Sequence, residues 1–172
     1  HSVSYAGFWR GQARLSIDDF MDKAKELGFD AIELAIAGKG VLTHQTTQGQ
    51  CEDIAEIGKK IGIEISSLAS GESWTSSPTA NDPEHRARII EFTQKAMQIA
   101  KWLGSDAYLF VPGAVDVFFL PDAEVVPYDV CYQRACEAIR QILPSAKETG
   151  VAICIENVWN KFLLSPLEMR DF

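Results

Sequence analysis

Four times in this 172-residue chain a lysine stands three residues before a glycine, and an apolar run follows each glycine. The four stretches are Lys25–Gly28, Lys59–Gly62, Lys101–Gly104 and Lys147–Gly150, followed by FDAIEL, IEISSL, SDAYLF and VAICIE. Glycine adopts the left-handed conformation that closes a helix, and a lysine in the last turn offsets the negative end of the helix dipole. A helix that leads into a short buried strand, several times over, is typical of a parallel α/β sheet.

Capping signals and periodicity predict the individual elements. Ser16 with Asp19 begins a helix whose inward face is Ile17, Phe20, Met21, Ala24 and Leu27, and Asp82 with Pro83 begins another. Ser165 to Glu168 is a further capping box. The expected order is strand 2–8, helix from 16, strand 31–35, helix 47–61, strand 63–68, helix from 83, strand 107–111, helix 128–149, strand 151–155 and a last helix from 166.

Two α/β architectures fit five such β/α units. A doubly wound sheet is complete at this length, whereas a (β/α)8 barrel needs roughly 250 residues. However, the turn after the first strand, AGFWRGQARLS, lacks a glycine-rich phosphate loop, and the sequence stops as a new unit begins. Both points favour a truncated (β/α)8 TIM barrel, so we expect its amino-terminal part, with residues 1–172 as a single domain.

Composition excludes several classes of protein. The net charge of -8 argues against binding to nucleic acid, which requires basic residues on one face. No apolar run reaches the roughly 18 residues of a membrane span, and no signal segment opens the chain. The four cysteines have no C-x-x-C pair, which favours reduced thiols; they are Cys51, Cys131, Cys136 and Cys154. We therefore expect a cytoplasmic protein without nucleic-acid or membrane partners.

The chemistry is expected where the strands end, because both architectures bind ligands at the carboxyl ends of their strands. The predicted strand ends carry an aromatic, neutral and acidic rim that suits a sugar, and its members include Tyr5, Trp9, Ser70, Trp74, Gly113, Asp116 and Asn160. The long segment 112–127 carries Val117, Phe118, Phe119 and Leu120 in a row. Both a packed surface loop and a lid over the site fit this segment.

Glu156 is the strongest single candidate for a ligand or catalytic residue. It directly follows the buried run VAICI, so its carboxylate must be paired, coordinated or solvated in a cleft. The alternatives to a ligand or catalytic role are a helix cap or an ion pair with Lys161. Glu33 ends a similar run, with more apolar residues beyond it. No two histidines have metal-binding spacing, and no P-loop, dinucleotide fingerprint or G-x-S-x-G motif occurs.

Four segments resemble the sugar-phosphate isomerase/epimerase members of the xylose-isomerase-like barrel superfamily, above all ketose 3-epimerases and L-ribulose-5-phosphate 3-epimerase-like enzymes. The segments are GFDAIEL, ISSLASG, VPGAVDVFF and ICIENVWNKFLLSPLEMRDF. The resemblance implies a (β/α)8 barrel with one divalent metal ion, Mn2+, Mg2+, Co2+ or Zn2+. It places Glu156 as metal ligand and acid/base, and the other ligands, an aspartate, a histidine and a glutamate, beyond Phe172.

By the same resemblance, Tyr5, Trp9, Ser70, Trp74 and Asn160 line a pocket for a sugar or sugar phosphate. Some of these epimerases carry a second glutamate a few residues after the first, and this chain has VWNKFLL there. Two rival functions remain open at this point. One is a metal-dependent phosphodiesterase or endonuclease of the same superfamily; the other is a non-catalytic sugar-binding half barrel that forms a homo-oligomer.

Overall fold

The structure is a computed structural model that describes residues 15–172. The strand predicted over 2–8, and with it Tyr5 and Trp9, lies outside the described residues. The elements are α1 (Ile17–Glu26), β1 (Ala31–Ala35), α2 (Gln48–Ile61), β2 (Glu64–Ala69), the 3-10 helix η3 (Glu72–Trp74), α3 (Pro83–Trp102), β3 (Ala107–Phe110), α4 (Tyr128–Thr149), β4 (Ala152–Ile155) and α5 (Pro166–Asp171). Every element predicted within these residues is therefore present.

The helix ends follow the local chemistry that the sequence predicts. The side chains of Ser16 and Ser165 accept hydrogen bonds from the backbone N–H three residues on, at 3.1 and 3.2 Å, and Asp82 accepts from Glu84 N at 2.8 Å. The four glycines of the repeated pattern have φ between 76° and 84°. Only glycine adopts this conformation at little cost, so each helix ends where the next strand must begin.

The four strands form one parallel sheet in the order β1-β2-β3-β4. A doubly wound sheet reverses its strand order at a switch point, whereas a barrel adds each strand beside the one before it. The observed order therefore decides between the two predicted architectures in favour of the barrel. A register shift occurs between Ile32 and Glu33, opposite Ser66, whose hydroxyl donates to the carbonyl of Ile32 at 3.0 Å.

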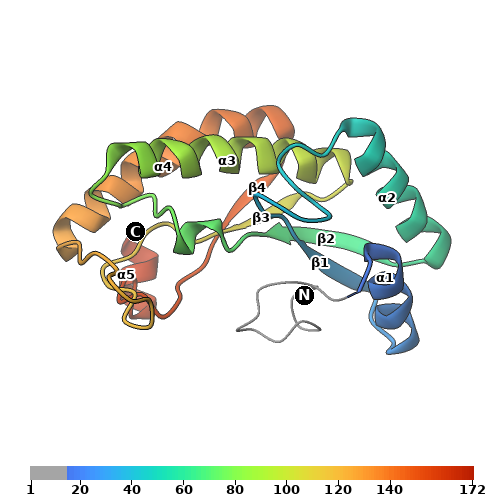
Figure 1. The fold of residues 1–172 in the computed structure, drawn as a ribbon, viewed down its shortest axis with the longest axis horizontal. Helices are drawn as coiled ribbons and strands as arrows, with labels where there is room; N and C mark the ends of the chain where they lie inside the picture. Colours follow the sequence, from blue (N-terminus) through green and yellow to red (C-terminus); the bar gives the residue numbers. More distant parts are fainter. Residues whose placement is uncertain (1–14) are drawn as a thin grey trace.

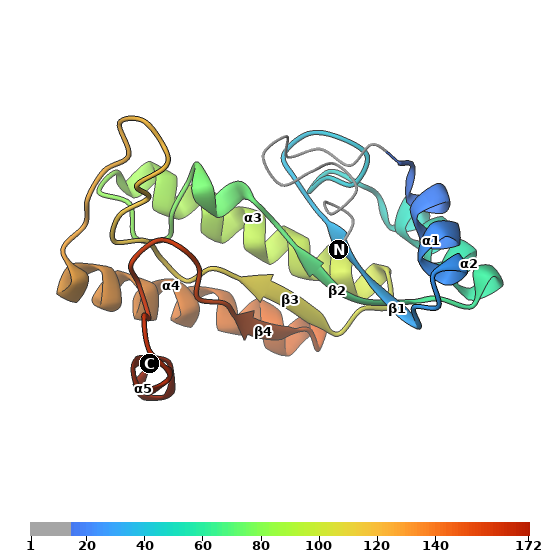
Figure 2. The same ribbon diagram turned by 90° about the horizontal axis from the view of Figure 1, so that it is seen from below.

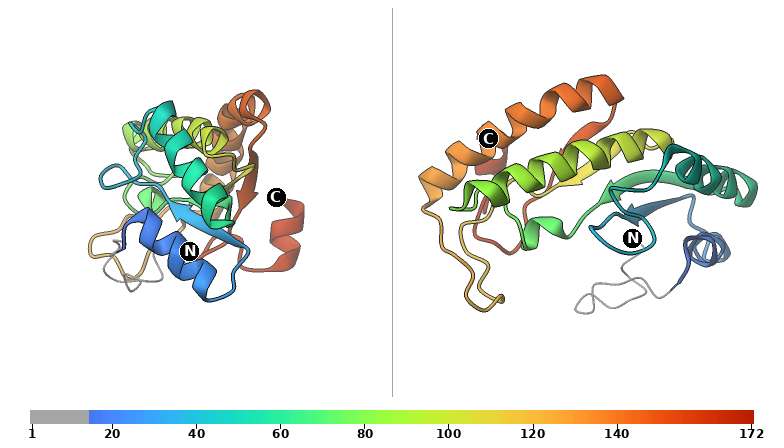
Figure 3. Two further views of the ribbon diagram at one scale, coloured as in Figure 1. Left: turned by 90° about the vertical axis from the view of Figure 1, so that its right-hand side faces the viewer. Right: turned by 45° about the horizontal axis from the view of Figure 1, so that its top comes forward.

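Helices α2, α3 and α4 lie together on one face of the sheet (Figures 1 and 3). The main core fills the space between them and the sheet, with Leu34, Leu68, Tyr108 and Phe110 pointing toward the helices. Figure 2 looks onto the other face, which the described helices leave open. One predicted core position is wrong: Leu27, placed on the inward face of the first helix, is 56% exposed because α1 ends at Glu26 and the chain turns there.

Candidate functional site

The open face of the sheet carries the first part of the candidate site. Along β1, Ile32 and Leu34 are buried against the helices, so Glu33 between them points to the opposite face. Its carboxylate Oε2 accepts a hydrogen bond from the hydroxyl of Ser67 on β2 at 2.8 Å. In a barrel this face becomes the interior, so a polar pair here lies beneath the mouth where ligands bind.

Glu156 lies at the carboxyl end of β4, where its backbone N–H continues the ladder by donating to Phe110 O at 3.0 Å. Partial burial raises the pKa of its carboxyl above the ordinary value, and the negative charge of Glu33 raises it further. The fold thus brings the charge of Glu33 near enough to influence a carboxyl that stands 123 positions later in the sequence, 156 minus 33. A nearby like charge disfavours ionisation of the Glu156 carboxyl.

The Glu156 carboxylate has neither hydrogen bond nor ion pair within residues 15–172. The predicted alternative partner, Lys161, pairs instead with Asp116 at 2.5 Å. That pair joins the segment after β4 to the loop after β3 and leaves Glu156 without a cation. A partly buried carboxylate with a raised pKa and no structural partner is characteristic of a functional group, because a purely structural carboxylate acquires donors.

The described residues do not by themselves form a metal centre. Within 15–172, no group of three or more histidine, cysteine, aspartate or glutamate side chains is placed to hold a metal ion. Glu156 and Glu33 supply only oxygen donors, which match the preference of Mg2+ and Mn2+. The metal-ligand role of Glu156 stays a prediction, since residues 15–172 supply no complete set of donors.

An aromatic cluster stands at the same end of the sheet. The ring of Trp74, in η3, meets Phe119 edge to face with centroids 5.3 Å apart, and Phe119 also contacts Phe118 at 5.4 Å and Trp159 at 6.4 Å. The cluster thus joins the loops after β2, β3 and β4. Sequence reasoning proposed Trp74 as a site residue and placed Phe119 in a loop that could be a lid, but it missed Trp159, whose signal was an aromatic residue in the segment that follows the strand before Glu156.

Ser70 follows β2 at the same end. Its hydroxyl accepts a hydrogen bond from the backbone N–H of Glu72 at 3.2 Å, so it helps to shape the turn into η3. Ser70 and Trp74 therefore lie on one short segment, and both are partly exposed. Their contact with a substrate stays a prediction.

Gly113 and Asn160, both predicted to bind the substrate, are joined to each other by a hydrogen bond. Asn160 is 1% exposed, and its amide donates to the carbonyl of Gly113 at 2.6 Å while its side-chain oxygen accepts from Phe162 N at 3.1 Å. The backbone carbonyl of Asn160 accepts from both Val115 and Asp116. These bonds tie the loop after β3 to the segment after β4, and so they position Glu156. Contact of Gly113 or Asn160 with a substrate stays a prediction.

The long loop 112–127 is packed against the protein rather than detached from it. Val117 and Val126 are buried, and Val126 N donates to Val115 O at 2.9 Å. Val126 belongs to a second core cluster with Phe162 and Leu163, which also anchors the segment that leads into α5. Other positions of the loop are exposed, among them Phe118 at 68% and Val125 at 64%. The packed-loop interpretation is thus supported for the base of the loop, while the aromatic tip remains available to a ligand.

The sequence model for the xylose isomerase-like TIM barrel family matches residues 21–172. The chain belongs to this family. Comparison with curated protein sequences finds no significant match. The matched region contains β1 to β4 and Glu156, so both the fold and the candidate site lie within it.

Solved structures of similar fold include sugar epimerases. A D-psicose 3-epimerase crystallised in the presence of D-fructose has a TM-score of 0.71 at 21% identity, over 89% of this chain and 50% of that one. D-psicose 3-epimerase with D-tagatose from Clostridium cellulolyticum H10 has a TM-score of 0.77 at 17% identity, over 96% and 56%. An L-ribulose 3-epimerase has a TM-score of 0.66 at 17% identity, over 83% and 44%. The chain spans about half the length of these structures, and the likeness shows the fold.

Two of the composition-based predictions can be compared with the structure. None of the helices within residues 15–172 has the length and apolar character that crossing a membrane requires. All four cysteines are free thiols, with Cys51 and Cys131 buried. Burial raises the pKa of each of these two thiols to about 11.

Proposed function

We propose that this xylose isomerase-like barrel acts in the epimerisation or isomerisation of a ketose or ketose phosphate, with Glu156 as the acid/base and as a metal ligand. The observation that carries the proposal is the Glu156 carboxylate itself. It stands at the strand end where this fold performs chemistry, its pKa is raised by partial burial, and Lys161 is occupied by Asp116.

The proposed reaction is a proton transfer next to a carbonyl group. Ionised Glu156 takes the proton from the carbon beside the ketose carbonyl, the C–H electron pair forms the new C=C bond, and the carbonyl π pair moves to oxygen to give an enediolate. A second group then returns a proton, to the opposite face for epimerisation or to the neighbouring carbon for isomerisation. A carboxyl with a raised pKa serves this step because its proton affinity lies closer to neutral pH.

A divalent cation fits the chemistry of the two carboxylates on the open face. Glu156 would hold it, with Glu33 close enough to influence the charge of the site. When bound, Mn2+, Mg2+, Co2+ or Zn2+ polarises the substrate oxygens and lowers the cost of the developing negative charge. The missing donors are proposed to lie outside the described residues, and we expect residues 1–172 alone to be nearly inactive.

The aromatic cluster supports a sugar as the substrate. Trp74, Phe119 and Trp159 present ring faces and edges at the mouth, where the C–H faces of a sugar can stack while its hydroxyls reach polar groups. We propose a cytoplasmic protein with a small-molecule partner, no nucleic-acid or membrane partner, and a possible homo-oligomer. The net charge of -8 supports the absence of a nucleic-acid partner.

The test measures proton abstraction directly. The complete protein is incubated in deuterated water with Mn2+ or Mg2+ and a panel of ketoses and ketose phosphates, and incorporation of deuterium beside the carbonyl is followed by NMR. Glu156→Gln is expected to abolish exchange, since an amide cannot accept the proton. The matched control is Glu64→Gln, the same change at an exposed position at the start of β2. Full exchange activity in Glu156→Gln removes Glu156 from the mechanism.

A further inference from the structure

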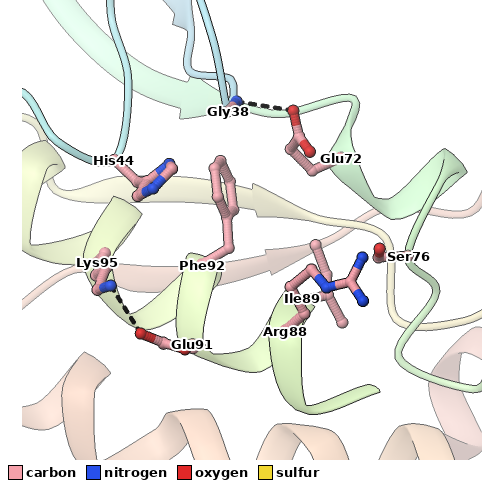
Figure 4. Close-up of a pocket in the computed structure, with 9 residues that line it drawn as sticks. All are labelled: Gly38, His44, Glu72, Ser76, Arg88, Ile89, Glu91, Phe92 and Lys95. Atoms are coloured by element: carbon pink, nitrogen blue, oxygen red, sulfur yellow. Dashed lines mark hydrogen bonds and ion pairs between the residues drawn. The ribbon is translucent and has the colours of Figure 1, made fainter. Parts of the chain in front are cut away.

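A pocket of about 290 Å3 lies between the loop after β1, η3 and the first half of α3 (Figure 4). Its lining residues are Gly38, His44, Glu72, Ser76, Arg88, Ile89, Glu91, Phe92 and Lys95. Ile89 and Phe92 also belong to the core between the helices and the sheet. The pocket is therefore on the helical side of the sheet, whereas Glu33 points to the open side, and none of its lining residues is assigned to the site proposed above.

Arg88 is the cationic side chain of this pocket that could bind an anion. It is an exposed residue of α3, and within residues 15–172 its guanidinium has no hydrogen-bond or ion-pair partner. The other flexible cation of the pocket, Lys95, is already paired with Glu91 at 2.7 Å, so these two charges offset each other (Figure 4). In Figure 4 the guanidinium of Arg88 points toward Ser76, across the pocket from the loop that carries His44.

Two further polar atoms of the pocket lack partners. Glu72 accepts a hydrogen bond from Gly38 N at 2.8 Å through Oε1, and no described residue donates to its Oε2. Nδ1 of His44 is buried without a hydrogen bond, although the imidazole ring is held edge-on against Phe92, with centroids 5.6 Å apart. Buried polar atoms are almost always paired, so an unpaired one beside a cavity indicates a missing partner.

We propose that this pocket binds a small hydroxylated anion, either a sugar phosphate or a sugar acid. The planar guanidinium of Arg88 suits a phosphate or carboxylate group through two parallel hydrogen bonds. The free oxygen of Glu72 accepts a ligand hydroxyl, His44 Nδ1 gains a polar partner, and Phe92 provides an apolar wall. The volume is at the small end of ligand pockets, which restricts the ligand to a few carbon atoms.

The charges of the pocket support a ligand with two different ends. Because Glu91 is offset by Lys95, the remaining charges are the positive Arg88 and the negative Glu72. A bare anion is attracted by the first and repelled by the second. An anion that carries hydroxyl groups satisfies both, since its charged group binds Arg88 and a hydroxyl donates to Glu72.

The experiment titrates the intact protein with glycerol 3-phosphate and with glycerate, and uses glycerol as the uncharged probe. Calorimetry gives the affinity, and amide NMR follows Gly38 and its neighbours. We expect at least one of the two anions to bind at millimolar concentration or below, and glycerol not to bind. Arg88→Gln should weaken binding by about tenfold or more, because a charge-assisted pair is lost. Arg140→Gln, at an exposed position of α4 outside the pocket, should leave it unchanged.

A second variant, at Glu72, tests the proposed hydroxyl contact independently of Arg88. Glu72→Gln should weaken the hydroxylated anions, which lose the charged acceptor of their carbon-bound hydroxyl, but should not weaken inorganic phosphate, which also escapes the repulsion from Glu72. The anion that binds more tightly identifies the phosphate or the carboxylate as the natural charged group. Absence of binding, equal losses in Arg88→Gln and Arg140→Gln, or binding abolished by Glu156→Gln would each overturn the proposal, and none of these outcomes tests the epimerase chemistry itself.

Discussion

Adding one methyl group at Gly113 should disrupt the packing of the loop after β3, which lies beside the candidate site. A Cβ at Gly113 would lie 2.4 Å from Thr79 Cγ2 and 3.2 Å from Cys131 Sγ. Thr79 is 0% exposed, and its hydroxyl is fixed by accepting from Ala114 N at 3.0 Å and donating to Ala114 O at 3.1 Å. Thr79 therefore cannot rotate away from the new methyl without losing hydrogen bonds.

The magnitude follows from the two ways in which the protein can respond to Gly113→Ala. If the backbone moves, overpacking of a buried site costs about 1–3 kcal/mol. If Thr79 rotates instead, Ala114 N loses its acceptor, and an unsatisfied buried donor also costs about 1–3 kcal/mol. Either route lowers the free energy of unfolding by a similar amount, so we expect a loss of about 1–3 kcal/mol.

Urea unfolding followed by circular dichroism measures this loss, provided that the slope of the transition is unchanged. Gly49→Ala is the matched control, because a Cβ there meets nothing within 4 Å and alanine stabilises a helix by about 0.5–1 kcal/mol over glycine. Thr79→Ser removes the methyl group that clashes, so Gly113→Ala should cost less in that background. Wild-type stability in Gly113→Ala, or no difference between the two backgrounds, would refute the packing argument.

Three other predictions test the site and its surroundings. Asn160→Ala should lower the free energy of unfolding by roughly 2 kcal/mol or more, because Gly113 O and Phe162 N both lose buried partners, and thermal or urea unfolding checks this. Glu156→Gln should become more stable relative to wild type as pH rises above 4.5, because the raised pKa means that ionising Glu156 costs more in the folded state than in the unfolded state; a stability difference that does not change with pH would contradict this sign. Cys51 and Cys131, with pKa values of about 11, should resist alkylation at pH 8 until the protein unfolds, as mass spectrometry of native and denatured samples can show.

Local sequence was sufficient for the elements of this fold. Helices end where a glycine can adopt positive φ, at Gly28, Gly62, Gly104 and Gly150. Helices begin where a side chain accepts a backbone hydrogen bond, as Ser16 and Asp82 do. These interactions span only a few residues, so the sequence displays them directly. Leu27 fits the helical period but is exposed, because burial depends on which element comes to cover it.

The site was only partly visible in the sequence. Glu156 was evident because a carboxylate after a buried strand needs an explanation, and the family resemblance predicted the barrel before the strand order was known. The pairing of Lys161 with Asp116, the structural amide of Asn160 and the contact between Trp74 and Phe119 were not predictable, because each joins segments at least 40 residues apart.

By itself, then, the sequence determined to within about one residue where the helices and strands of residues 15–172 begin and end, and that a carboxylate directly follows one of the buried strands. The tertiary structure alone decided that the charge of Glu33 influences Glu156, that Lys161 pairs with Asp116 rather than with Glu156, and that Arg88 and Glu72 border one pocket. The physical reason is the sequence separation of the residues that interact. Capping and backbone conformation are settled between near neighbours, whereas charge pairing and burial depend on which distant strands and loops the folded sheet brings side by side.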